Sequence, residues 1–222
     1  TVGMDAVLSI TANNINVGFN AATSTTNSAL FPEAAIDFST MTGGGLNVPT
    51  GGTPVKLDFN SPIIRASVAD FRLQISQFIF VRGSFAFEKG QTLNAPLVGG
   101  GATEVDTMTI GASNVHVFVG IDGPYWTDTD NDGVIEASDT PSGNSIGIAL
   151  QNVNVGVFFA KETALVNAAR YTALKVTATS AATVGMDAVL SIVANGISVG
   201  FNAATSTTNS ALFPEAAINF SA

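Results

Sequence analysis

The sequence contains no cysteine, a single histidine and few charged residues. Without cysteine the chain forms no disulfide, no thiolate zinc site and no thiol nucleophile. Its 8 Lys and Arg against 17 Asp and Glu give a net charge of −9, which argues against binding nucleic acid phosphates or an anionic membrane surface. No apolar run approaches the ~18 residues of a transmembrane helix, so we expect no membrane insertion.

The strongest pattern is a repeat with an offset of 182 residues. Residues 1–40 return as residues 183–222, which indicates a tandem duplication. We therefore interpret 1–182 as one full period and 183–222 as the start of the next. The first residues, TVGMDAVLSI, lack the basic region of a signal peptide, so we expect a longer protein that continues in both directions. The copies differ at five of forty positions, Thr11/Val193, Asn14/Gly196, Asn16/Ser198, Asp37/Asn219 and Thr40/Ala222.

Alternating apolar residues predict that the chain is mainly β. Stretches such as LQISQFIFV, GSFAFEK and NVHVFVG have the period and composition of half-buried strands. A common outline recurs in which an Asn-containing polar break separates two alternating apolar runs. Only residues 162–174 show a helical pattern. Two architectures stay open, an elongated β-repeat resembling a stacked sheet or solenoid, and a β-sandwich. The outline covers residues 8–19, 73–85, 108–120, 148–160 and 190–201.

An acidic loop interrupts this pattern. Six of the 17 acidic residues lie between Asp122 and Asp139, and no Lys or Arg occurs from Glu104 to Ala160. Residues 128–139, DTDNDGVIEASD, match the D-x-[DN]-x-[DN]-G calcium pattern, with Gly133 at the turn and an apolar Ile135 to anchor the loop. The predicted ligands are oxygen atoms, which suit Ca²⁺. They belong to Asp128, Asp130, Asp132, the Val134 carbonyl, Glu136 and Asp139.

The loop departs from a paired EF-hand. Asp139 stands where an EF-hand has Glu, so the loop resembles dockerin-type and thrombospondin-type calcium repeats. The flanking PYW and TPSG segments do not predict the two helices of an EF-hand. We therefore predict a structural ion on a β scaffold rather than a calcium switch. A solvated acidic turn without an ion is the alternative interpretation.

Other side chains give weaker signals. His116 lies in an alternating run without a second His or Cys, so a structural role is favoured over catalysis. Tyr125 and Trp126 are interpreted as loop anchors, with stacking on a sugar as the alternative. No G-x-S-x-G motif occurs, and we expect no enzymatic activity. Core packing is favoured over a hydrophobic groove for Phe78, Phe80, Phe85 and Phe87.

The long repeat, the strands rich in Thr, Ser, Asn, Ala and Gly, the absence of cysteine and the DTDNDGVIEASD loop resemble the tandem repeats of very large secreted bacterial surface proteins. That resemblance implies an extracellular, cell-surface location. It also implies a structural role in a filament, adhesin stalk or biofilm matrix fibre, stabilised by calcium. Neighbouring copies of the repeat are then the expected partners.

We hypothesise that the end strands of one unit pair with the next, so deleting residues 183–222 weakens assembly or leaves an open edge. The first alternative is a calcium-dependent adhesin module that binds glycans through Tyr125 and Trp126. An enzyme of the polysaccharide-lyase or hydrolase kind and a lipid-conducting groove are further alternatives.

Overall fold

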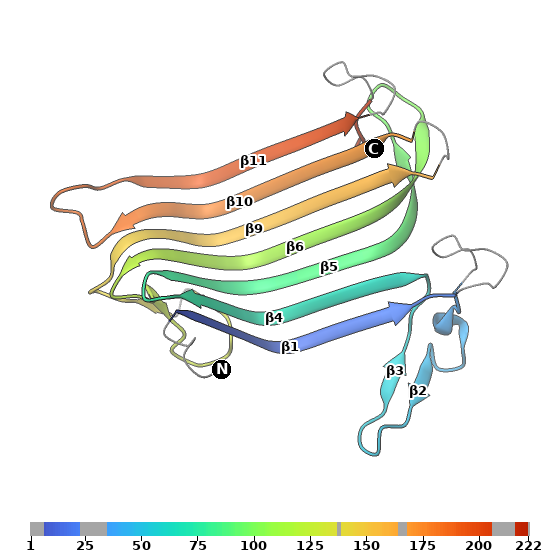
Figure 1. Ribbon diagram of the computed structural model, residues 1–222, viewed down its shortest axis with the longest axis horizontal. Helices are drawn as coiled ribbons and strands as arrows, with labels where there is room; N and C mark the ends of the chain where they lie inside the picture. The colour runs from blue at the N-terminus through green and yellow to red at the C-terminus, as the bar shows by residue number, and fades with distance from the viewer. Residues whose placement is uncertain (1–6, 23–34, 137–138, 164–167, 206–215, 222) are drawn as a thin grey trace.

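The described residues are mainly β-strand with almost no helix, and most of the strands belong to one open sheet. The computed structural model describes residues 7–22, 35–136, 139–163, 168–205 and 216–221. Seven long strands form an antiparallel sheet in chain order (Figure 1). They are β1 (Leu8–Asn20), β4 (Ile63–Ile75), β5 (Ile79–Pro96), β6 (Ala102–Ile121), β9 (Ile146–Glu162), β10 (Arg170–Val184) and β11 (Val193–Thr205).

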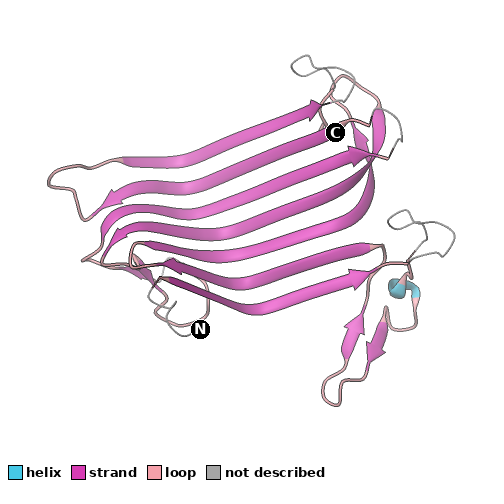
Figure 2. Cartoon of the chain, in the orientation of Figure 1, coloured by secondary structure: helices cyan, strands magenta, loops and turns pink. Residues whose placement is uncertain are grey.

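The remaining elements are short and lie in the connections, outside the large sheet (Figure 2). A 3-10 turn spans Phe38–Thr40. Two small hairpins follow it in the chain. They are formed by β2 (Leu46–Val48) with β3 (Val55–Leu57) and by β7 (Trp126–Thr127) with β8 (Thr140–Pro141).

The single layer bears directly on the sequence predictions. A mainly β chain is confirmed, but the described strands form one open sheet in place of the two packed sheets of a β-sandwich. The helical pattern over 162–174 is wrong for its described part, because Arg170–Leu174 lie in β10. Pairing with β9 on one side and β11 on the other overrides the weak local preference.

The boundary of the sequence repeat does not coincide with the end of a strand. The first period ends at residue 182, which lies inside β10 (Arg170–Val184). The first copy of the repeated segment provides β1, and the second copy provides β11 at the opposite edge of the sheet. The repeat boundary therefore does not divide the described residues into two folded bodies.

Strand β5 defines the two faces of the sheet, because its backbone is regular from Ile79 to Glu88 and its side chains alternate there. Ile79, Val81, Phe85 and Phe87 lie on one face, which we call the apolar face. The even-numbered residues lie on the other, the loop face. Partners on adjacent strands share a face, so the register assigns every row of residues to one of them.

Two neighbouring rows on the apolar face consist wholly of apolar residues. The first row is Ile15, Val68, Phe85, Ala112, Val155, Val176 and Val199. The second row is Val17, Ala66, Phe87, Ile110, Val157, Leu174 and Phe201. The apolar face is therefore continuous from β1 to β11.

Strands β1, β6, β9 and β11, which bend partway along their length (Figure 1), each contain a residue in the left-handed helical (αL) backbone region. Asn14, Asn114, Asn152 and Gly196 have φ of 54°, 49°, 50° and 63°. Asn and Gly tolerate this conformation best. In each of these strands the αL residue acts as one extra residue relative to the regular strand β5. It shifts by one the alternation of side chains between the two faces, so that apolar side chains before and after it lie on the same face.

This geometry explains the polar break in the repeated outline. In residues 8–19, 108–120, 148–160 and 190–201, the break contains the left-handed residue. In 73–85 the break is instead the turn between β4 and β5, so that segment is a hairpin. The exchange of Asn14 for Gly196 between the copies retains a residue type suited to positive φ.

The connections pack on the loop face. Phe118 stacks with Tyr125 of the acidic loop at a centroid distance of 6.0 Å. Phe59, which precedes β4, lies where a Cβ on Gly18 would project, 2.9 Å from that position. Phe220, near the C-terminus, contacts Phe158 at 5.4 Å. Gly18, Phe118 and Phe158 all belong to loop-face rows.

The predicted core role of the four Phe side chains is only partly right. Phe80, on the loop face, packs with Phe118 at 6.2 Å. Phe85 and Phe87 lie on the uncovered apolar face, where Phe85 contacts Phe71 at 5.0 Å. Phe78 lies in the turn before β5 and is 53% exposed.

Candidate metal centre

The acidic loop connects β6 to β9 and packs back onto the loop face. Trp126 meets the His116 ring edge-on at 4.9 Å, and Tyr125 meets Trp126 at 4.7 Å. His116 is buried, its Nδ1 lies 3.1 Å from the Asn114 carbonyl oxygen, and burial lowers its pKa. These contacts agree with the interpretation of the aromatic residues as anchors of the loop and of His116 as structural.

The local turn of the loop has the geometry that its sequence predicts. Gly133, at the sixth position, has φ of +97°, which favours glycine. Ile135, at the eighth position, is 4% exposed. Its carbonyl accepts a hydrogen bond from Asn114 Nδ2 at 3.0 Å, which ties the loop to β6.

Three of the predicted ligands lie together. One carboxylate oxygen from each of Asp128, Asp130 and Asp139 lies within 4.8 Å of the others. The carboxylates of Asp132 and Glu136 are outside this cluster. Asp132 Oδ1 instead accepts from the Val134 amide at 2.7 Å. The structure therefore brings together three of the five predicted side-chain ligands.

Asp139 closes the loop through its backbone contacts. Its Oδ1 accepts hydrogen bonds from the Thr129 amide at 2.8 Å and from Thr129 Oγ1 at 3.0 Å. Its Oδ2 accepts from the Glu136 amide at 3.0 Å. The two amide donors hold the pKa of Asp139 below its usual value. Asp139 therefore joins the two ends of the loop.

Arginines from distant strands partly neutralise the loop, which sequence spacing did not reveal. Arg82 of β5 donates to Asp128 Oδ2, and Arg72 of β4 lies 3.6 Å from the same oxygen. Burial raises the pKa of Asp128, but the hydrogen bond and charge of Arg82 outweigh burial and lower it overall. The signal was available in the alternation of β5, which puts Arg82 on the face of Phe80.

Two features favour a bound cation beside the ion pair of Arg82 and Asp128. Asp128 Oδ1 is buried and has no hydrogen-bond partner among the described residues. The pKa of Asp130 is raised. The amide of Asp132 lowers it, but partial desolvation and the carboxylates of Asp132, Asp128 and Asp139 raise it by more. A divalent cation satisfies the free oxygen and relieves the repulsion.

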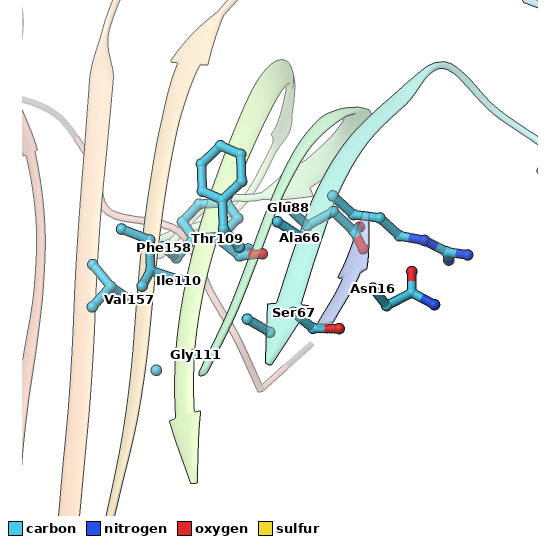
Figure 3. A pocket seen from close by; sticks show the side chains of 13 residues that line it. Asn16, Ala66, Ser67, Glu88, Thr109, Ile110, Gly111, Val157 and Phe158 are labelled. Atoms are coloured by element: carbon cyan, nitrogen blue, oxygen red, sulfur yellow. The ribbon is translucent and has the colours of Figure 1, made fainter. Parts of the chain in front are cut away.

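A hollow of about 390 Å³ adjoins Asp128 and is lined by Tyr125, Trp126 and Arg72. A second hollow of about 690 Å³ lies over the middle of the sheet, where Gly111 and Gly156 carry no side chain. Figure 3 shows this second hollow, with Asn16 and Ser67 toward one side and Phe158 toward the other. The first hollow combines aromatic and charged groups next to the acidic loop.

No protein family, curated protein or solved structure matches the chain. Among the described residues, no helix has the length and hydropathy needed to cross a bilayer.

Proposed function

We propose that the chain is a structural repeat of an extended extracellular filament, stalk or matrix fibre, in which consecutive repeats join edge to edge into one sheet. Calcium at the acidic loop stiffens each repeat. The observation that carries the proposal is that the two edge strands, β1 and β11, are copies of the same segment.

The two copies run in the same direction, because six antiparallel steps separate them. They also present the same face. Phe19 of β1 and its copy Phe201 of β11 both lie on the apolar face, as the register shows. Since β1 uses one edge to pair with β4, and β11 uses the opposite edge to pair with β10, each copy leaves free the edge that the other uses.

The register also predicts how repeats join. The row that starts at Val17 ends at Phe201, the copy of Phe19. The row that starts at Ile10 ends at Ala194, the copy of Ala12. Each repeat therefore shifts a row by two residues, an even number, which preserves the faces. In a longer chain, β11 pairs with the next β4 and Val199 stands opposite the next Ala66.

The calcium part of the proposal uses a smaller ligand set than the sequence predicted. Asp128, Asp130 and Asp139 hold the ion, with Arg82 on the other oxygen of Asp128. An oxygen-rich site of this kind suits Ca²⁺. Extracellular modules bind calcium with Kd of ~10⁻⁴–10⁻³ M, so a site of this affinity is largely occupied at a calcium concentration of a few millimolar.

The junction is tested in a two-period chain, residues 1–222 followed by a second copy of 41–222. The chain lacks cysteine, so paired cysteines report on single contacts. Antiparallel partners have Cα atoms ~4.5–5.5 Å apart, which a disulfide spans. We expect Val199→Cys with Ala66→Cys of the second copy to cross-link under mild oxidation, measured by gel mobility and peptide mass.

Two matched pairs serve as controls. Val17→Cys with Ala66→Cys, partners within the first sheet, gives the reference rate. Val199→Cys with Ser67→Cys of the second copy places the thiols on opposite faces and should not cross-link. If the Val17 pair forms and the Val199 pair does not, the sheet is not continuous and the proposed array is wrong.

Calcium is tested by thermal unfolding of the 222-residue chain at ~2 mM calcium and in excess chelator. We expect chelation to lower Tm by about 2–6 °C, and Asp130→Ala to abolish the difference. Asp132→Ala should retain it, because Asp132 lies outside the cluster. Equal Tm with and without calcium in the wild type would contradict the site.

A calcium-dependent glycan-binding module is the second candidate, favoured by the 390 Å³ hollow with its Tyr125 and Trp126 lining. Aromatic rings and charged groups recognise sugars in such hollows. Glycan-array binding that disappears with chelator and with Trp126→Ala would support it. Binding to no glycan on the array would leave the structural role alone.

A further inference from the structure

Among the described residues, the connections pack on parts of the loop face and leave the apolar face bare. On β1, Ile15, Val17 and Phe19 are 63%, 73% and 65% exposed, and on β11 Val199 and Phe201 are 53% and 49% exposed. The exposure also reaches the interior of the sheet, where Ile110 of β6 is 40% exposed. It is therefore a property of the whole face and is not confined to its edges.

The accessible surface of the chain is correspondingly large. It is 13704 Å², about 4,200 Å² more than the ~9,500 Å² expected of a folded monomer of 22.6 kDa. Exposed apolar patches on monomers rarely exceed a few hundred Å². Obligate dimers bury ~2,000–5,000 Å² in total, or ~1,000–2,500 Å² on each partner. The excess on one chain is therefore more than large enough to supply such an interface.

The chemistry of the face suits another sheet. Its rows contain β-branched, Leu and Phe side chains, and Lys89 is the charged residue among the partners of Ile10, Ile15, Val17 and Phe19. Such side chains interdigitate when two sheets stack ~10 Å apart. The net charge of −9 disfavours an anionic lipid surface as the occupant.

We propose that the apolar face packs against the apolar face of a second copy of the chain, giving a two-layer sheet with a loop face on each outer side. That the second copy belongs to a separate chain rests on the proposed edge-to-edge array. In that array the next repeat of the same chain pairs with the free edge of β11, so it cannot also cover the apolar face. A two-fold axis that runs in the interface parallel to the strands brings each row against its equivalent.

The test is sedimentation equilibrium of the 222-residue chain with three lysine substitutions on exposed side chains. Ile110→Lys and Val17→Lys alter the apolar face, and Thr109→Lys alters the loop face one residue away on β6. We expect the wild type and Thr109→Lys to sediment at twice the monomer mass. Ile110→Lys should raise the dimer Kd at least ~100-fold, because it buries unpaired charge.

Each other outcome overturns the proposal. A wild-type chain that is monomeric at 100 µM, or a Thr109→Lys variant that dissociates as readily as Ile110→Lys, excludes pairing through this face. A monomer that binds phosphatidylcholine vesicles, and loses binding with Ile110→Lys, assigns the face to lipid. The junction cross-link in the two-period chain is read on a different surface, so it distinguishes failure of the face contact from failure of the array.

Discussion

The loop face and the apolar face belong to the same seven strands and differ in what covers them. On β6, Phe118 of the loop face is 1% exposed under the acidic loop, whereas its neighbour Val119 on the apolar face is 44% exposed. The connections thus bury one face locally. The other face keeps its apolar surface available to a partner, as single-sided coverage of an antiparallel sheet allows. Substitutions at adjacent residues on opposite faces measure this difference directly.

The largest difference in the loss of unfolding free energy is expected between substitutions of Arg82, on the loop face of β5, and Val81, on its apolar face. Arg82→Ala leaves the Asp128 carboxylate, whose side chain is 5% exposed, with Arg72 as its remaining cationic neighbour among the described residues. Breaking a buried ion pair costs about 3–5 kcal/mol. Val81→Ala on the half-buried apolar side should cost about 1 kcal/mol in a single chain. Urea unfolding measures both, and equal losses would contradict the assignment of the two faces.

Alanine substitutions of Phe118 and Val119 on β6 should likewise differ in how much they lower the free energy of unfolding. Phe118→Ala removes a ring packed against both Phe80 and Tyr125 and should cost about 3–4 kcal/mol. Val119→Ala should cost less than about 1 kcal/mol in a single chain. In the proposed dimer the Val119 cost rises with protein concentration, whereas the Phe118 cost does not. A concentration-independent Val119 effect would weaken the face-to-face pairing.

A smaller effect is expected where the strands bend, because the left-handed residues keep the two faces distinct. Asn152 of β9 has φ of 50°. Asn152→Val should destabilise the chain by about 1–2 kcal/mol, since a β-branched residue is strained there. Asn152→Gly should be almost neutral, as Gly196 is in the equivalent position of β11. Comparable losses for both variants in urea unfolding would argue against the backbone explanation.

The smallest expected effect on stability is the pH dependence contributed by Glu162, on the loop face of β9. Its carboxylate accepts hydrogen bonds from the Ala169 amide at 3.0 Å and from Tyr171 Oη at 2.9 Å. The Ala169 amide has the largest effect and lowers the pKa of Glu162. Burial raises this pKa by less, and the Tyr171 and Thr103 hydroxyl donors lower it further, so the net shift is downward. The stabilisation is present above the unfolded pKa of ~4.3 and is lost as pH falls through the lower folded value.

Wild-type stability should therefore fall more between pH 5 and pH 3 than that of Glu162→Gln, which has no carboxylate to protonate. Chemical unfolding at several pH values compares them. Parallel pH curves would show that Glu162 does not contribute.

Local pattern was sufficient to predict strands, but not their arrangement. Alternation predicted most of the strand segments, and the polar break marked the bends at Asn14, Asn114 and Asn152. The same break in 73–85 proved to be a turn, because Ser76 has a positive φ outside any strand. Whether seven strands form one layer or two depends on long-range packing that period alone does not encode.

The acidic loop shows the same limit. Positions Gly133 and Ile135 act within the loop, and sequence spacing predicted both roles. The charge balance of Asp128 depends on Arg72 and Arg82, which the fold supplies from β4 and β5. Neither arginine is near Asp128 in sequence. Spacing therefore predicted the three carboxylates that lie together but missed the counterions.

The meander order of the strands has a mechanical consequence for the proposed array. Each repeat contributes six strands at ~4.8 Å spacing, or about 29 Å of fibre length. The same 182 residues span ~600 Å when pulled straight. The strands lie across the fibre, so tension acts on the hydrogen bonds between them and releases one strand after another. Such a fibre holds a length reserve of about twenty-fold, which lets an overloaded attachment stretch before it breaks.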